Sequence, residues 1–272
     1  AMITTRRWLD LVGLPRAVQF ESPGSWLTRA ALSQGVTVLE LLDHVGWRPA
    51  GDFDLVFALL YRDGLPPELP MWAGLEVARR VLVGHQVAGC RPEGLLVADE
   101  RRRCRQHPHL HGGMRGRYRF CPGCLRDDFT PYVRQEWRLD CWRYCPIHAC
   151  LLADRCGRCG GAVELPASLV CAGPGQRGIA DLGDCIRCGA SLGETVPQPL
   201  ETIHPWDRDL NRARLANGRA MVAALYHRRL RVLGEARDRP LRQLRLLEYL
   251  TVVPPEVVAK EAVSGGASAG GR

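Results

Sequence analysis

Eight cysteine and histidine residues in the middle of the chain fall into four closely spaced pairs. In each pair two residues separate the members, a spacing at which a tight turn directs both side chains at one ion. The pairs are Cys121 and Cys124, Cys145 and His148, Cys156 and Cys159, and Cys185 and Cys188. Four thiolate or imidazole ligands form a tetrahedron, the closed geometry of structural zinc. The spacing therefore predicts two zinc ions as cofactors.

Sequential pairing is the favoured assignment, because each couple of neighbouring pairs flanks one compact insert. It gives one zinc to Cys121, Cys124, Cys145 and His148, and the second to Cys156, Cys159, Cys185 and Cys188. Spacing alone also allows a cross-braced arrangement. Five cysteines lack a partner at this spacing and are expected to be small buried side chains: Cys90, Cys104, Cys141, Cys150 and Cys171. Cys171 is an alternative ligand for the second zinc. The alternating His107, His109 and His111 favour a surface cluster over a metal site.

The segment before this block carries the signals of short helices. Ser22 and Pro23 open a helix that Gly35 closes, and a capping box at Thr37 opens a second that stops at Gly46. Two short helices joined by a turn resemble a helix-turn-helix, although an ordinary helical hairpin fits the periodicity better. The second helix carries two acids and no lysine or arginine, so we do not expect it to read DNA.

The fold class predicted from these patterns is mainly α, with small zinc-ribbon or zinc-knuckle β elements. Further helices are expected over 55–62, 68–84, 131–142, 207–233 and from Pro240 to about Thr251, with an extended strand over 115–119. The expected domains are an N-terminal helical subdomain (1–95), a basic strand with a tandem zinc module (96–195), a C-terminal helical region (196–263) and a disordered tail (264–272).

Charge is distributed unevenly along the chain. Residues 1–100 carry nine arginines against twelve acids, a net charge of −3, whereas residues 101–272 have a net charge of +11. An acidic partner such as DNA should therefore meet the second part. The arginines with the spacing to contact phosphates alternate along the strand or lie one helical turn apart in 131–142: Arg115, Arg117, Arg119, Arg134 and Arg138. Tyr118 and Trp137 are candidate packing partners for DNA.

Catalysis is not expected from this sequence. Both zinc sets contain four protein ligands and leave no open position for water. The sequence has no HExxH, phosphate-binding loop or GxSxG motif. Asp127 and Asp128 resemble a nuclease carboxylate pair, but a role at the entry to the helix that follows is simpler. No apolar run approaches the length of a membrane span, and no secretory signal is recognised, so a cytoplasmic protein is expected.

The zinc block also resembles a known family. The run from Cys121-Pro122 through Asp128, Pro131-Tyr132, Arg134 and Trp137-Arg138-Leu139 to Cys145-Pro146-x-His148 and Cys156-x-x-Cys159-Gly160 is similar to the TniQ/TnsD transposition family. Pro15 and the run Glu21-Ser22-x-x-Ser25-Trp26-Leu27-x-Arg29 resemble that family's opening signature. The chain departs from the pattern at Gly157, where the family often has proline, and the region after residue 200 shows no resemblance.

The resemblance implies a target-site selection factor of a bacterial transposon, which is not an enzyme. Such a protein binds DNA and links a target determinant, either a DNA sequence or a CRISPR effector, to an AAA+ ATPase that regulates the transposase. Two alternatives remain: a zinc-ribbon transcription regulator, which needs no ATPase, and a zinc-dependent nuclease, which needs an open metal site. We expect the acidic residues 1–90 to dock on the ATPase, with Arg6, Arg7 and Trp8 as the partner-binding anchor.

Overall fold

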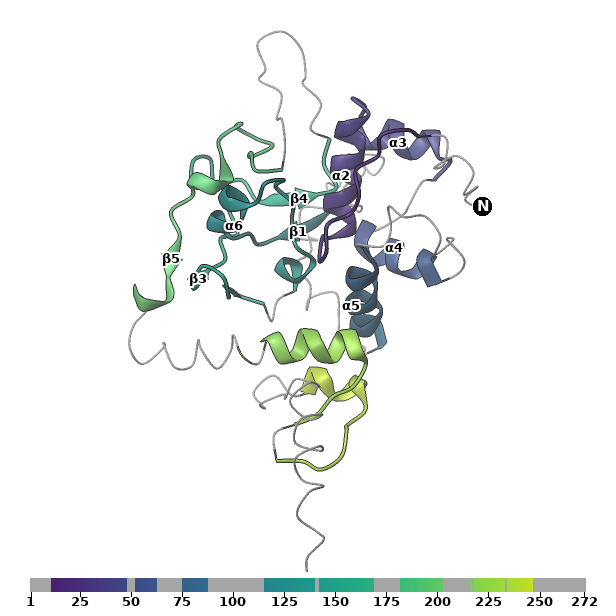
Figure 1. The fold of residues 1–272 in the computed structure, drawn as a ribbon, viewed down its shortest axis with the longest axis vertical. Coiled ribbons are helices and arrows are strands. Elements are labelled where there is room, and N and C mark those ends of the chain that lie inside the picture. The colour runs from purple at the N-terminus through teal and green to yellow at the C-terminus, as the bar shows by residue number, and fades with distance from the viewer. Residues whose placement is uncertain are drawn as a thin grey trace, which may run out of the picture.

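The computed structural model describes residues 11–47, 52–62, 75–87, 115–139, 142–168, 182–202, 216, 218–232 and 234–246. It has helices towards the N-terminus and small antiparallel sheets around the cysteine-rich centre, in agreement with the predicted class (Figure 1). Among the helices that the structure describes, none is both long and apolar enough to cross a bilayer.

The first two helices begin where their caps predict. Helix α2 (Pro23–Ser33) has Ser22 as its N-cap, and the Ser22 hydroxyl accepts a hydrogen bond from the Ser25 amide at 3.1 Å. Helix α3 (Val38–His44) opens with a complete capping box between Thr37 and Glu40. Both chain reversals after these helices use glycines with positive φ, Gly35 and Gly46, as the sequence predicts.

Two longer helices complete the N-terminal part, α4 (Phe53–Arg62) and α5 (Glu76–Val87). A core of aromatic and aliphatic side chains holds α2, α3 and α4 together, and Trp26, Trp47, Phe53 and Phe57 are its largest buried members. The structure thus confirms a helical N-terminal region. Its function as a helix-turn-helix stays a prediction.

The centre of the molecule contains two small sheets. Strand β1 (Gly116–Tyr118) pairs antiparallel with β4 (Val163–Leu165). The other sheet has the order β2-β3-β5, formed by Tyr144–Cys145, Cys150–Leu151 and Gln198–Pro199. A one-and-a-half-turn helix, α6 (Pro122–Asp127), lies against the 3-10 helix η5 (Leu192–Glu194).

The helix predicted over 131–142 is wrong. Only the 3-10 turn η4 (Gln135–Arg138) forms, and the residues before it are extended. The Ser22 amide donates to the Val133 carbonyl at 2.9 Å, and the Gln135 amide donates to the Phe20 carbonyl at 2.8 Å. Pairing with the chain just before α2 satisfies the backbone groups that a helix would otherwise have used.

The first C-terminal helix ends earlier than the sequence predicts. A helix spans residues 218–227 and stops there, six residues before the expected end at 233. The segment from Pro240 begins as a 3-10 helix, η7 (Leu241–Leu246), and its expected continuation lies outside the described residues. Between them the chain forms a hairpin closed by a β-bridge between Leu230 and Arg239.

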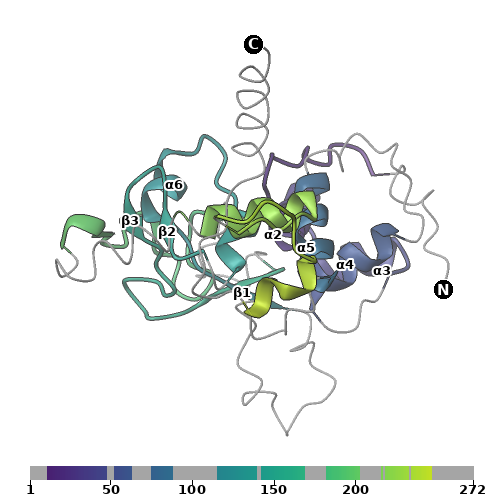
Figure 2. The same cartoon turned by 90° about the horizontal axis from the view of Figure 1, so that it is seen from below.

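The main hydrophobic core draws on all three expected regions. It contains Val81 from α5, the aromatic residues Tyr118 and Trp137 with cysteines of the centre, and Ala224 and Leu225 from the C-terminal helix. The helix of residues 218–227 lies beside α5 in both views (Figures 1 and 2). Gly84 of α5 permits this approach, because a Cβ there would overlap the Leu225 backbone.

Candidate metal centres

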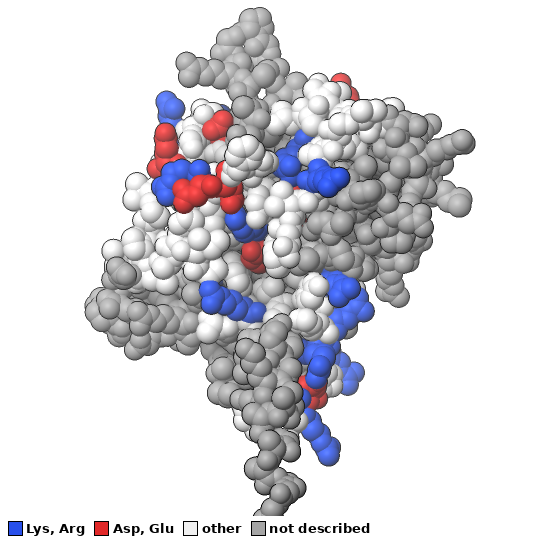
Figure 3. Space-filling view, viewed as in Figure 1, with Lys and Arg blue, Asp and Glu red and all other residues white. Residues whose placement is uncertain are grey.

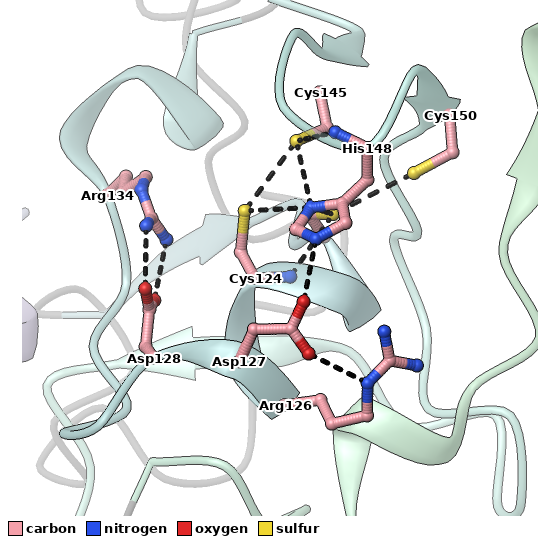
Figure 4. Close-up of polar contacts among 9 residues, drawn as sticks. Cys124, Arg126, Asp127, Asp128, Arg134, Cys145, His148 and Cys150 are labelled. Carbon is pink, nitrogen blue, oxygen red and sulfur yellow. Dashed lines mark hydrogen bonds and ion pairs between the residues drawn. The ribbon is translucent and has the colours of Figure 1, made fainter.

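The first quartet of candidate ligands comes from two loops that meet beside α6. Cys121 is the N-cap of α6, and Cys124 lies in its first turn. Cys145 ends strand β2, and His148 follows in the turn that leads to β3. The ligand atoms of these four residues all lie within 4.8 Å of one another (Figure 4).

The spacing of these atoms fits a tetrahedral zinc ion. Bonds of about 2.3 Å to sulfur and about 2.0 Å to nitrogen place the corners of such a tetrahedron about 3.5–3.8 Å apart. The Sγ atoms of Cys124 and Cys145 are 3.6 Å apart. The Nδ1 atom of His148 lies 3.4 Å from the sulfurs of Cys121 and Cys124, and 3.7 Å from that of Cys145.

The second quartet is built from two similar knuckles. The sulfurs of Cys156 and Cys188 are 3.8 Å apart, and those of Cys159 and Cys185 are 3.6 Å apart. Each knuckle turns back on a glycine at positive φ, Gly160 or Gly189, and that glycine's amide donates to the carbonyl of the knuckle's first cysteine. The four Sγ atoms of this quartet also lie within 4.8 Å of one another, so they fit one tetrahedral ion.

The geometry agrees with sequential pairing. Neighbouring pairs in the sequence gather into one quartet, and no described residues form the cross-braced arrangement. A zinc ion bound in each quartet would crosslink two loops and keep no ligand position for water. Cys90, Cys104, Cys141 and Cys171, with the three histidines of 107–111, lie outside the described residues, so the alternative ligand Cys171 is not tested.

Hydrogen bonds and burial spread the pKa values of the thiols apart within each quartet. A hydrogen bond with Cys124 is the largest effect that lowers the pKa of Cys121 to about 2, and the same contact raises that of Cys124. The backbone amide of Gly161 lowers the pKa of Cys159 to about 7, whereas burial raises that of Cys185 to about 12. Each quartet thus stabilises a thiolate, the form that binds a metal.

Cys150 is a fifth cysteine next to the first quartet. Its Sγ atom lies 3.7 Å from that of Cys121, and burial raises the pKa of its thiol to about 12. The side chain is 2% exposed and belongs to the main core. The structure therefore places Cys150 where the sequence predicts a small buried side chain.

Asp127 supports the first quartet, a role that spacing did not suggest. Its carboxylate lies 3.0 Å from Nε2 of His148, on the side of the ring opposite the three sulfurs (Figure 4). The hydrogen bond from the Arg126 guanidinium is the largest effect that lowers the pKa of Asp127, and the contact with His148 is the second. A carboxylate at Nε2 fixes the ring orientation and leaves Nδ1 free to bind a metal. Asp128 instead pairs with Arg134 at 2.9 Å, so the two acids do not act as one carboxylate pair.

Replacing Asp127 with alanine should weaken zinc binding at the first quartet by about 10- to 100-fold, the usual cost of losing a carboxylate that orients a histidine ligand. Competition with a chromophoric chelator measures this affinity. Glu194→Ala, which removes an exposed carboxylate from η5, is the matched control. Equal zinc affinity in the two variants would show that Asp127 does not orient His148.

The three strand arginines lie on one side of β1, as their alternation predicts. Arg115 is exposed, Arg117 and Arg119 are partly exposed, and the intervening Gly116 and Tyr118 are buried. The Arg119 guanidinium donates to the carbonyls of Leu139 and Trp142 at 3.4 and 3.3 Å. Arg115 and Arg117 are the members of this set best placed for a phosphate.

Arg134 and Arg138 have partners within the protein. Arg134 is held by both oxygens of Asp128 and lies over the rings of Tyr132 and Trp137, at 4.5 and 4.9 Å from the ring centres. Trp137 is 1% exposed and Tyr118 also 1%, which leaves neither ring accessible to a base.

The Arg138 side chain is 0% exposed and forms ion pairs with Asp52 and Asp54. Burial alone would lower the pKa of the Arg138 guanidinium, but the carboxylates of Asp54 and Asp52 outweigh this effect and raise the pKa above its usual value. The guanidinium therefore stays charged. Gly116 makes room for it, because a Cβ at this position would overlap the guanidinium. Arg138 thus joins the N-terminal helices to the central sheets and cannot reach a phosphate.

The candidate partner anchor Arg6, Arg7 and Trp8 lies outside the described residues.

The polar residues at the start of α2 form an internal hydrogen-bond network. Glu21, 0% exposed, accepts hydrogen bonds from the Ser25 hydroxyl at 2.8 Å and from Arg29 at 2.7 Å. The Ser25 hydroxyl in turn accepts from the Val133 amide at 3.0 Å. These residues belong to the opening signature, but their sequence pattern alone does not indicate this structural role.

The sequence matches a known protein family. A family model described as TniQ matches residues 14–152, just over half of the chain. The match includes the whole first quartet and the network at the start of α2, and it ends before the second quartet. No curated protein matches the chain.

Proposed function

The chain belongs to the TniQ family, a transposon-associated family, and from that premise we propose that it is a target-site selection adaptor. In this role it binds DNA and links a target determinant to an AAA+ ATPase that regulates the transposase. The observation that carries the proposal is the family match over the same residues that build the first metal quartet. The determinant is a DNA sequence or a CRISPR effector.

The geometry favours a binding protein over the nuclease alternative. In each quartet four protein ligands surround one point, which fits a structural zinc and leaves no position for an activated water. Asp127 and Asp128 are engaged by different partners, His148 and Arg134. We propose zinc for both quartets, with the eight named residues as its ligands.

The adaptor role requires that the chain recruit the ATPase to DNA. A supershift experiment tests it with labelled duplex, the purified chain and the AAA+ regulator of the same transposon. A slower band that needs all three components is expected. DNA binding without recruitment would favour the transcription-regulator alternative, and cleavage of the duplex in the presence of zinc would favour the nuclease.

We further propose that residues 1–90 dock on the ATPase through Arg6, Arg7 and Trp8. Substituting these three residues with alanine in the full chain tests the anchor more sharply than removing residues 1–20. The Trp26 indole donates to the Pro15 carbonyl at 2.9 Å, so that deletion would damage the helical core as well. Lost recruitment with an unchanged thermal melt supports the anchor, and retained recruitment excludes it.

DNA binding is proposed to use the exposed strand arginines. Replacing Arg115 and Arg117 with alanine should lower the slope of log affinity against log salt by up to about 2, because each phosphate contact contributes about 0.9. Fluorescence anisotropy with a labelled duplex at several salt concentrations measures the slope. An unchanged slope would show that this face of β1 does not contact the DNA backbone.

We also propose the domain division 1–95, 96–195 and 196–263, with the tail 264–272. The Arg138 ion pairs and the shared main core connect the first three regions. We therefore expect them to unfold together, in a single thermal transition.

A further inference from the structure

The C-terminal part of the described chain is strongly basic. Residues 218–246 contain eight arginines and two acids, Glu235 and Asp238. Figure 3 shows blue side chains gathered over the lower part of the molecule, where Figure 1 draws these residues, with little red among them. None of these arginines is among the five that the sequence spacing predicts to contact DNA phosphates, which all lie between residues 115 and 138.

Both acids are engaged inside the hairpin. The Asp238 carboxylate accepts hydrogen bonds from Nε of Arg229 at 2.9 Å and from Nε of Arg231 at 2.8 Å. Glu235 forms an ion pair with Arg239. These pairs brace the two sides of the hairpin. They also leave no carboxylate in residues 218–246 to neutralise the remaining arginines.

Five arginines remain outside these pairs, and the structure describes the side chains of four of them as exposed. We call these four the C-terminal arginine surface: Arg219, Arg228, Arg237 and Arg242. Within the described part of the chain, none of the four has an ion pair or hydrogen-bonded side chain. The helix that precedes Arg228 packs against α5. Leu225 packs against Gly84 of α5, and the ring of Tyr226 lies 5.3 Å from the Arg80 guanidinium.

Arg228 holds an unusual backbone conformation. It directly follows the last residue of the helix at 227, with φ of 55°, a left-handed region that disfavours any residue with a Cβ. Helices commonly end with glycine in this conformation. An exposed arginine here costs stability and gains no described partner, which points to a use outside the fold.

We propose that the C-terminal arginine surface binds the phosphate backbone of duplex DNA, an inference that rests on the proposed function. A guanidinium group binds two phosphate oxygens through two parallel hydrogen bonds. The surface gives affinity without sequence preference, because phosphate contacts carry no base information directly. It supplements Arg115 and Arg117, since Arg119, Arg134 and Arg138 are engaged within the protein.

The test compares two full-length variants that each lose three charges. Arg228→Gly, Arg237→Gln and Arg242→Gln alter the surface, whereas the control carries Arg16→Gln, Arg158→Gln and Arg187→Gln, three exposed arginines elsewhere. Anisotropy of a labelled duplex across salt concentrations gives the slope of log affinity against log salt. The slope is expected to fall by about 2 to 3 in the first variant and by less than 1 in the control.

Arg228→Gly alone separates binding from folding. Glycine suits the backbone at this position, so the melting temperature should stay equal or rise, while the salt slope falls by about 1. An unchanged slope in the surface variants, or an equal fall in the control, would overturn the inference and leave the proposed function standing. Unchanged DNA binding with lost ATPase recruitment would assign the surface to a protein partner instead. No DNA binding by the native chain would overturn both.

Discussion

Replacing Arg138 with alanine is expected to lower the free energy of unfolding by about 3–5 kcal/mol, the usual cost of removing one partner from a buried ion pair. The guanidinium is 0% exposed, and Asp54 beside it is 1% exposed. Without Arg138, the carboxylates of Asp52 and Asp54 would face each other in the interior with no counter-charge. The largest loss should occur where both are ionised.

Asp54 shows why the loss should spread through the fold. Its carboxylate accepts hydrogen bonds from the Gly24 amide at 2.8 Å, from the Tyr118 hydroxyl and from Arg138. It therefore connects the start of α2 to strand β1 and to η4. Losing the cation should loosen the N-terminal helices from the central sheets.

Urea denaturation followed by circular dichroism measures the effect at neutral pH. Arg117→Ala, which removes a partly exposed arginine from the same strand region, is the control and should change stability by less than about 1 kcal/mol. If Arg138→Ala does not fold, Asp52→Asn gives a milder disruption of the same pair, expected to cost about 1–3 kcal/mol. A change below about 1 kcal/mol in both Arg138→Ala and Asp52→Asn would contradict the buried pair.

Replacing Cys124 with serine is expected to prevent folding of the central region and to release the zinc of the first quartet. Structural zinc contributes about 10–16 kcal/mol of binding free energy in small modules, as large as the stability of a whole domain. Cys124 is 2% exposed and lies in the main core. The loss of its bond therefore removes both the crosslink and a packing element.

Cys159→Ser should have a smaller effect. Cys159 is exposed, so its replacement should release the second zinc and disorder the outer knuckle while α2, α3 and the first quartet persist. Zinc content and the thermal melt of each variant measure the difference, with Cys150→Ala as a control that should keep both ions. Two zinc ions and a native melt for Cys124→Ser would contradict the ligand assignment.

Local features of the fold could be predicted from the sequence. The two quartets depend on pairs two residues apart, and a knuckle of four residues has few conformations that direct both ligands at one ion. The helix caps at Ser22 and Thr37 are equally local, because each hydroxyl accepts a hydrogen bond from the backbone amide three residues later in the chain. These predictions required no knowledge of distant contacts.

The roles of the arginines could not be predicted in this way. Arg134 and Arg138 lie four residues apart, which suggested one basic helical ridge, but the backbone before Arg138 pairs with residues 20–22. The partners of Arg138 are 84 and 86 residues distant in the chain. An arginine that faces phosphate and one that faces a buried carboxylate are identical in sequence, and only tertiary contacts distinguish them.

The family signature also has a physical explanation that one sequence does not show. Glu21 lies just before α2, and Ser25 and Arg29 lie on consecutive turns of that helix. The Glu21 carboxylate accepts hydrogen bonds from both side chains in the interior. Through Ser25 this network holds the Val133 amide, which lies six residues after α6 ends at Asp127. The opening signature and the zinc block are thus parts of one packed unit.

We propose that two closed zinc sites organise the central region of this TniQ-family chain and that the chain acts as a binding protein. Metal analysis of the purified full chain, by inductively coupled plasma mass spectrometry against protein concentration, tests it most directly. The predicted result is about two zinc ions per chain that survive dialysis. One ion or none in a folded protein would contradict the claim.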